Sequence, residues 1–206
     1  LPSPTLTMLL LLLLSLVSVH SQMIPQCPCS TFEPCFAKTA SVVEQCADRC
    51  RNQFTSLGAD YNAARACIMS KIGPLRGTLS CARSSFGQVC GSGTVPKRHP
   101  ETVQLAAFRE ISGMMSRSGI GAEASGLLQV GRKAIGCIVK CVQSQSCARQ
   151  SCGLALPGDN QIVSTVMGCA RQSGLLSTAS LRDTCSCLSR AGLRQLTPLC
   201  PRLTIS

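Results

Sequence analysis

Apolar residues recur three or four positions apart along most of the chain, and sustained alternation of apolar and polar residues is absent. The first spacing is that of one face of an α-helix, whereas alternation would indicate strands. In the first such stretch, Ser30 and Glu33 match a capping box before Pro34, and Gly58 is suited to end the helix. The apolar face between them consists of Cys35, Thr39, Val42, Cys46, Cys50 and Phe54.

Further helical stretches follow along the chain. Asp60 is placed to cap a helix that Gly73-Pro74 would end, and Asp159 to cap a later one. Ser180 indicates the start of another helix. Two more apolar stripes consist of Leu105, Phe108, Ile111 and Met115 within residues 101–117, and of Leu128, Ala134, Ile135, Ile138, Cys141 and Val142. The chain is therefore predicted to be mostly α.

The first residues have the pattern of a secretory signal peptide. Met8 is followed by an unbroken run of apolar and small residues from Leu9 to Val19, too short to span a bilayer. We expect cleavage after Ser21, with residues 1–7 as translated upstream sequence. No second apolar run of that length follows, so the mature chain is expected to be extracellular, with no transmembrane segment.

Cysteine is abundant, and secretion makes oxidation its default fate. Zinc modules and redox sites favour closely paired cysteines, often with histidines, yet the chain has no C-x-x-C pair and the mature chain keeps one histidine, His99. Cys46 and Cys50, one helical turn apart, are expected to bond to a neighbouring helix rather than to each other. The disulfide candidates are Cys27, Cys29, Cys35, Cys46, Cys50, Cys67, Cys81, Cys90, Cys137, Cys141, Cys147, Cys152, Cys169, Cys185, Cys187 and Cys200. With no Trp, one Tyr and five Phe, such bridges would supply stability that aromatic packing does not.

Eight cysteines precede a long cysteine-free gap and eight follow it. An even number on each side allows each half to close its own bridges, and the spacings of the two halves partly repeat. We expect either two related cysteine-rich helical modules or one continuous domain. The modular division places the first module at 22–90, a linker and bridging helix at 91–123, and the second module at 124–206.

Catalytic chemistry finds little support. His99 lies in a basic loop, and neither a G-x-S-x-G elbow nor an H-E-x-x-H helix occurs. Gly119 to Ala124 fits G-x-G-x-x-A, but no predicted strand precedes it, and a turn explains it better. The sequence therefore predicts a protein that is not an enzyme and that has no cofactor or metal site.

The net charge of +11 indicates acidic partners, such as a polyanionic glycan or an acidic extracellular protein. Basic pairs occur at Lys97-Arg98 and Arg132-Lys133, where solvated surface is the simpler interpretation. Lys97-Arg98 also matches a dibasic processing site. Without stacking aromatics, nucleic-acid binding is not expected.

Ser-Gly dipeptides, the minimum for glycosaminoglycan attachment, occur five times. Ser112 and Ser125 each follow a glutamate two residues earlier, and Ser92 lies in the Gly-rich stretch 91–100. Turn and loop chemistry is the simpler explanation of these serines. They remain candidate attachment sites.

The segments "CPCSTFEPCFAKTASVVEQCADRC" and "ARACIMSKIGPLRGTLSCARSSFGQVC" resemble the cysteine-rich helical domains of secreted nematode proteins, in particular the chondroitin-proteoglycan-type domain. The resemblance covers residues 27–90 and extends to 137–200. It implies an extracellular, non-enzymatic protein, with some relatives serving as cores for chondroitin chains, although the basic charge here departs from a strong attachment pattern. We expect a secreted binding protein, or alternatively a matrix core protein. A small hydrophobic ligand held among the helices is a further expectation.

Overall fold

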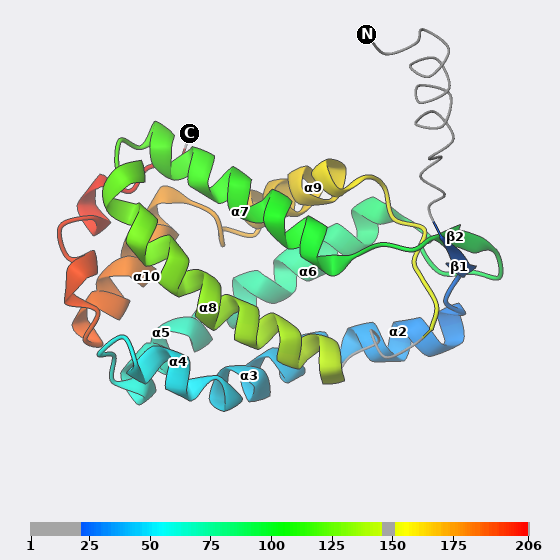
Figure 1. The fold of residues 1–206 in the computed structure, drawn as a ribbon, viewed down its shortest axis with the longest axis horizontal. Coiled ribbons are helices and arrows are strands. Elements are labelled where there is room, and N and C mark those ends of the chain that lie inside the picture. The colour runs from blue at the N-terminus through cyan, green and yellow to red at the C-terminus, as the bar shows by residue number, and fades with distance from the viewer. Residues whose placement is uncertain (1–21, 146–150, 206) are drawn as a thin grey trace, which may run out of the picture.

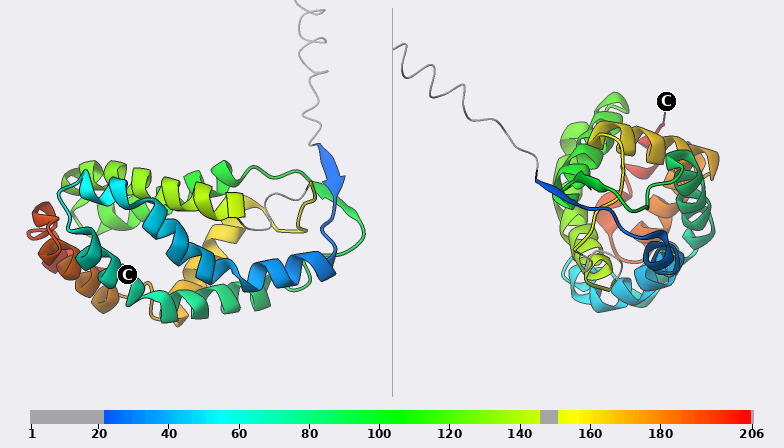
Figure 2. Two further views of the ribbon diagram at one scale, coloured as in Figure 1. Left: turned by 90° about the horizontal axis from the view of Figure 1, so that it is seen from below. Right: turned by 90° about the vertical axis from the view of Figure 1, so that its right-hand side faces the viewer.

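The structure is a computed structural model that describes residues 22–145 and 151–205. For residues 40 and 124–130 it describes the backbone alone. The predicted signal peptide lies outside the described residues. The helices lie around the long axis of an elongated molecule (Figures 1 and 2). The elements in chain order are β1 (Met23–Pro25), α2 (Cys29–Ala37), α3 (Thr39–Arg49), α4 (Arg51–Thr55), α5 (Tyr61–Met69), α6 (Ile72–Phe86), β2 (Thr94–Pro96), α7 (Pro100–Arg117), α8 (Gly121–Gln145), α9 (Asp159–Gln172), α10 (Thr178–Arg190) and the short 3-10 helices η2 (Arg194–Leu196) and η3 (Cys200–Arg202). The prediction of a mostly helical protein is confirmed.

The first predicted helix is divided into α2, α3 and α4, with breaks at Lys38 and Cys50. The prediction of a capping box is wrong, because α2 begins at Cys29 after Pro28 and neither Ser30 nor Glu33 caps it. The physical reason is that the Glu33 carboxylate is engaged by the Arg83 guanidinium of α6 instead. Gly58, with a φ of 86°, lies past the end of α4, as the sequence predicts.

Other predicted helix ends are partly right. The Ala63 amide donates to the Asp60 carboxylate across 2.8 Å, which confirms that cap. Gly73-Pro74 does not end a helix; both lie in the first turn of α6, where a missing proline N–H costs nothing. Asp159 is the first residue of α9 and does not cap it.

The start of α10 also differs from the prediction. The cap is Ser177 rather than Ser180, and the Ser177 hydroxyl accepts the Ser180 amide at 3.2 Å.

Residues 91–100, expected to be a linker, include a short strand. β2 pairs antiparallel with β1, with Ile24 opposite Val95. Gln26 also forms a bridge to Gly153, so the start of the described chain is held between both halves (Figure 1).

The prediction that the cysteines form disulfides is confirmed for the fifteen that the structure describes. Seven bridges have both partners described, Cys35 is disulfide-bonded as well, and Cys147 lies outside the described residues. The seven are Cys27–Cys152, Cys29–Cys90, Cys46–Cys141, Cys50–Cys137, Cys67–Cys187, Cys81–Cys169 and Cys185–Cys200. Five of them join the first eight cysteines to the last eight, so the halves do not each close their own bridges.

The bridges follow the helix packing. One fastens α3 to α8, and a second fastens Cys50, the residue after α3, to α8. One fastens α5 to α10 and one fastens α6 to α9, and each of these helix pairs is in direct contact. Cys46 and Cys50 thus bond outward to one neighbouring helix, as their spacing predicts. Between α6 and α9, buried Thr78 also shares a 2.7 Å hydrogen bond with Ser173.

The packing is divided among small clusters rather than one large core. One consists of Cys27, Phe32, Val89 and Cys90, a second of Ala59, Ala64, Ala191 and Leu193, and a third of Phe54, Tyr61 and Ala134. Such clusters bury little area each, which fits the expectation that covalent bridges contribute much of the stability.

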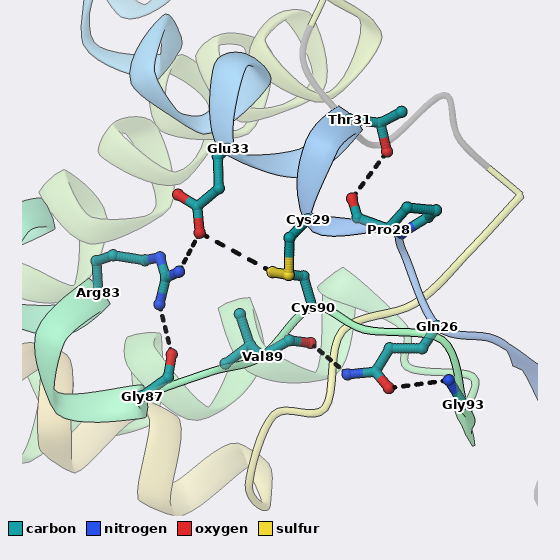
Figure 3. The surroundings of a disulfide bond; sticks show 10 residues. All are labelled: Gln26, Pro28, Cys29, Thr31, Glu33, Arg83, Gly87, Val89, Cys90 and Gly93. Carbon is teal, nitrogen blue, oxygen red and sulfur yellow. Dashed lines mark hydrogen bonds and ion pairs between the residues drawn. A yellow bond between two sulfur atoms is a disulfide. The ribbon is translucent and has the colours of Figure 1, made fainter.

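Figure 3 shows how one bridge is supported by polar contacts. Near Cys29–Cys90, the Arg83 guanidinium contacts the Glu33 carboxylate and donates to the Gly87 carbonyl. The Gln26 amide donates to the Val89 carbonyl at 3.0 Å. Together they hold the loop after α6 against α2.

Candidate functional site

An apolar cavity of about 300 Å³ lies between α7, α8, α10 and the C-terminal turns. This volume is at the lower end of the range for small-molecule sites. Among the described residues that line it, Thr184 alone carries a hydroxyl group. The lining consists of Phe108, Ile111, Met115, Ile120, Gly131, Ile135, Leu181, Thr184, Cys185, Leu188, Leu196, Leu199 and Leu203.

Helical periodicity brings these side chains to one place. Three of the four residues in the predicted α7 stripe line the cavity, and Leu105 is 46% exposed instead. α10 contributes Leu181, Thr184, Cys185 and Leu188, which share one helix face. Stripes on α7 and α10 thus form facing walls.

The third wall is the C-terminal segment, which the Cys185–Cys200 bridge fixes to α10. The Arg182 side chain donates to the Leu203 carbonyl at 2.8 Å, and Ser118 at the end of α7 donates to the Thr204 carbonyl at 2.6 Å. Segments far apart in sequence therefore enclose the cavity.

A smaller cavity of about 150 Å³ adjoins the first and shares Ile111, Met115, Leu181 and Leu203 with it. It extends the apolar space toward Ile205. The two cavities form one apolar region along α7.

Gly131 on α8 is a lining residue whose missing side chain leaves space. A Cβ atom built there meets nothing within 4 Å. Because Gly131 lines the cavity and a side chain there meets no neighbour at its Cβ atom, a larger residue is expected to take up cavity space.

One edge of the cavity is both open and positively charged. Ile135 is 47% exposed although it lines the cavity. The Arg132 guanidinium lies 4.7 Å from the centre of the Phe108 ring, across from α8 to α7. On the C-terminal side, Arg202 donates to Glu123 at 2.9 Å, and this hydrogen bond lowers the pKa of the Glu123 carboxyl.

The basic residues singled out in the sequence lie on two separate elements. Lys97 and Arg98 follow β2, where Lys97 contacts Gln22 and Arg98 makes a 3.0 Å ion pair with Asp159. The Arg98 side chain also donates to the Leu156 carbonyl at 2.8 Å. The dibasic pair is thus bound into the structure rather than carried on a free loop.

Arg132 and Lys133 both lie on α8 and are exposed, but Arg132 alone contacts a cavity residue in the described contacts. His99 precedes α7, is exposed and makes no side-chain cap. The structure therefore singles out Arg132 among these residues.

The candidate glycan-bearing serines are dispersed. Ser92 is exposed in the loop before β2, Ser112 is half-buried within α7, and Ser125 belongs to α8. Ser92 alone of the three lies outside a helix.

Over the described part of the chain, no three or more His, Cys, Asp or Glu side chains are grouped to hold a metal ion. The helices described at 29–145 and 159–190 include none with the length and apolarity needed to cross a membrane.

Comparisons with protein families, curated proteins and solved structures found no match to this chain.

Sequence reasoning identified the helical stripes that line part of the cavity, including Phe108 on α7 and Ile135 on α8, but not the way they come together. The C-terminal wall carried no periodic signal. Leu196, Leu199 and Leu203 lie in short 3-10 turns and their flanks. Their contribution depends on the Cys185–Cys200 bridge, whose partners sequence spacing does not identify.

Proposed function

We propose that the protein is a secreted, non-enzymatic binding protein that holds a small hydrophobic molecule in the cavity between α7, α8 and α10. The observation that carries this proposal is the cavity's lining, which among the described residues is apolar except for Thr184 and is open beside Ile135. Apolar pockets with few polar groups are typical ligand sites.

The extracellular setting is supported by the covalent framework. Seven described disulfides fit an oxidising compartment, where such bridges persist. The Cys185–Cys200 bridge also fixes the C-terminal wall of the cavity to α10 before any ligand arrives, which reduces the ordering cost of binding.

The expected affinity follows from the size of the cavity. Each buried methylene contributes about 0.8 kcal/mol, so roughly eight methylenes give about 6 kcal/mol before other terms. Micromolar to submillimolar binding is the corresponding range.

The test is calorimetric titration with 1-decanol, a neutral single-chain probe. Wild-type protein is expected to bind it, and Gly131→Leu is expected to abolish binding by filling the cavity. Gly136→Leu is the matched control, because Gly136 lies on the same helix, has equal space and does not line the cavity. Absent binding to wild type, or equal binding to Gly131→Leu, would contradict the proposal.

The alternative function is a matrix or proteoglycan-type core. The exposure of Ser92 in a non-helical loop is the observation that favours it. The intact, unreduced mass of the natively secreted protein tests it: an increase of kilodaltons that Ser92→Ala removes supports a glycan-bearing core, and a sharp unmodified mass contradicts it.

A further inference from the structure

We propose that the ligand is a single-chain amphiphile with an acidic headgroup, and that Arg132 binds this headgroup at the edge of the cavity. This proposal rests on the proposed function and specifies the chemistry of its ligand. It assigns the apolar chain to the cavity and the acid to one guanidinium group.

The position of Arg132 supports the assignment. Its chain neighbour Gly131 and the next-turn residue Ile135 both line the cavity, and its guanidinium lies over the ring of Phe108, a third lining residue. Since Ile135 is also the exposed lining residue, Arg132 lies beside the solvent-open edge. A chain lying in the cavity would end within reach of this side chain.

The Arg132 charge has no acidic partner among the described residues. The five ion pairs there use Arg65, Arg83, Arg98, Arg117 and Arg202. A guanidinium that lies over an aromatic ring still has free N–H groups along its own edge. These N–H groups can donate two parallel hydrogen bonds to a carboxylate.

Nearby carboxylates do not compete for Arg132. Glu110 on α7 pairs with Arg117, and Glu123 on α8 pairs with Arg202. Asp183 on α10 lines a different hollow beside Ser70 and Lys71. The charge of Arg132 is therefore available to a ligand.

The volume restricts the ligand to one short chain. The cavity of about 300 Å³ equals the liquid volume of roughly ten water molecules. Even with the adjoining cavity of about 150 Å³, the space is too small for the two long acyl chains of a phospholipid. A free single-chain acid is therefore the source of the headgroup.

The test compares decanoic acid with 1-decanol by calorimetry at pH 8, where the acid is ionised. Wild-type protein is expected to bind the acid about fivefold more tightly than the alcohol, the size of an exposed charge pair. Arg132→Gln is expected to lose this preference, so that the ratio of its affinity for the acid to its affinity for the alcohol falls to one. Far-ultraviolet circular dichroism shows that the variant is folded. Lys133→Gln, the adjacent exposed charge, is the matched control and is expected to keep the preference.

The outcomes separate the two proposals. If the wild-type protein binds decanol and decanoic acid with equal affinity, acid recognition is overturned and the cavity function stands. Equal loss of preference in Lys133→Gln and Arg132→Gln would also overturn it, because general charge attraction would then explain the difference. Failure of wild type to bind either probe would overturn the cavity function itself.

A vesicle arm tests the source of the acid. Wild type and Arg132→Gln are expected to bind vesicles of equal parts phosphatidylcholine and phosphatidylserine to the same extent at physiological salt, because the net charge of +11 rather than Arg132 attracts such a surface. Arg132-dependent vesicle binding that decanoic acid does not displace would overturn the assignment to a free single-chain acid.

Discussion

Tyr61 is buried at the start of α5, with its hydroxyl donating to the Asp48 carboxylate of α3 at 2.7 Å. Arg65 donates to the same carboxylate at 2.6 Å, and Arg51 lies over the Tyr61 ring. Burial, and then the hydrogen bond to Asp48, raises the pKa of Tyr61 to about 12. The hydrogen bonds from Arg65 and Tyr61 lower the pKa of Asp48.

Because Tyr61 is the single tyrosine of the chain, its ionisation is observable directly by ultraviolet absorbance. We expect a midpoint near pH 12 in the folded protein, against about 10 in the unfolded chain. A raised folded pKa stabilises the protein below pH 10, and this contribution is lost as the pH rises to 12. Asp48→Asn is expected to lower the midpoint. A folded-state midpoint at 10 would contradict the buried, hydrogen-bonded position.

Gly192, after α10, occupies a backbone position that favours glycine over any residue with a side chain. Its φ is 115°, and a Cβ atom there would lie 2.4 Å from the Gly58 carbonyl oxygen. The close approach aligns the Asp60 amide with the Ala191 carbonyl at 2.7 Å.

Gly192→Ala is expected to lower the free energy of unfolding by about 3 kcal/mol, since both the left-handed conformation and the clash disfavour a side chain. Gly174→Ala is the control: its φ is 74° but a Cβ atom meets nothing within 4 Å. It is expected to cost about 1 kcal/mol. Denaturant unfolding of both variants measures the difference, and equal losses would exclude the clash.

At the level of elements, α3 and α8 are joined by two parallel bridges. Cys46–Cys141 and Cys50–Cys137 lie four residues apart on both segments, with Cys50 directly after the end of α3. The Gln145 side-chain amide donates to both sulfur atoms of the first bridge. While one bridge remains, the other closes only a short ring.

Replacing one pair by serine is therefore expected to cost about 2 kcal/mol, the low end for a native disulfide, because the loop it closes is short. Removing both pairs is expected to cost more than the sum, since α3 and α8 are then joined only through distant bridges. Unfolding in denaturant without reductant measures the three variants. Strict additivity would show that the two bridges act independently.

The sequence predicted the presence of helices better than it predicted where each helix ends or which other elements it contacts. The apolar repeat around Cys46 identified a helical face, but neither Lys38 nor Cys50, where the helix breaks, is a glycine or proline that would signal it. Asp60 was predictable because its cap is local, whereas Glu33 was not because a distant arginine engages it. Local chemistry can be inferred from neighbouring residues, and long-range contacts cannot.

For the whole molecule, the same limit applies to the bridges and the cavity. Even cysteine counts allowed closure within each half, yet five bridges cross between the halves. The α7 stripe indicated a buried face, but only the folded chain places it opposite Leu188 and Leu199. Whether the two halves arose as related modules stays a prediction.

The crossed bridges predict the behaviour of a cut chain. A recognition sequence for a site-specific protease can be inserted between His99 and Pro100. This site lies between the first eight cysteines and the last eight. After cleavage we expect one species in non-reducing electrophoresis and two fragments after reduction, because all five crossing bridges span this site. Release of fragments without reductant would contradict the pairing.

The crossing of the bridges also affects how the chain is made. Five early cysteines find their partners 87 to 125 residues later. At about 5–20 residues per second, synthesis of those partners takes seconds to tens of seconds. Any bridge that forms among these five cysteines in that interval is non-native and must be exchanged later. A disulfide isomerase is therefore expected to raise the yield of native protein.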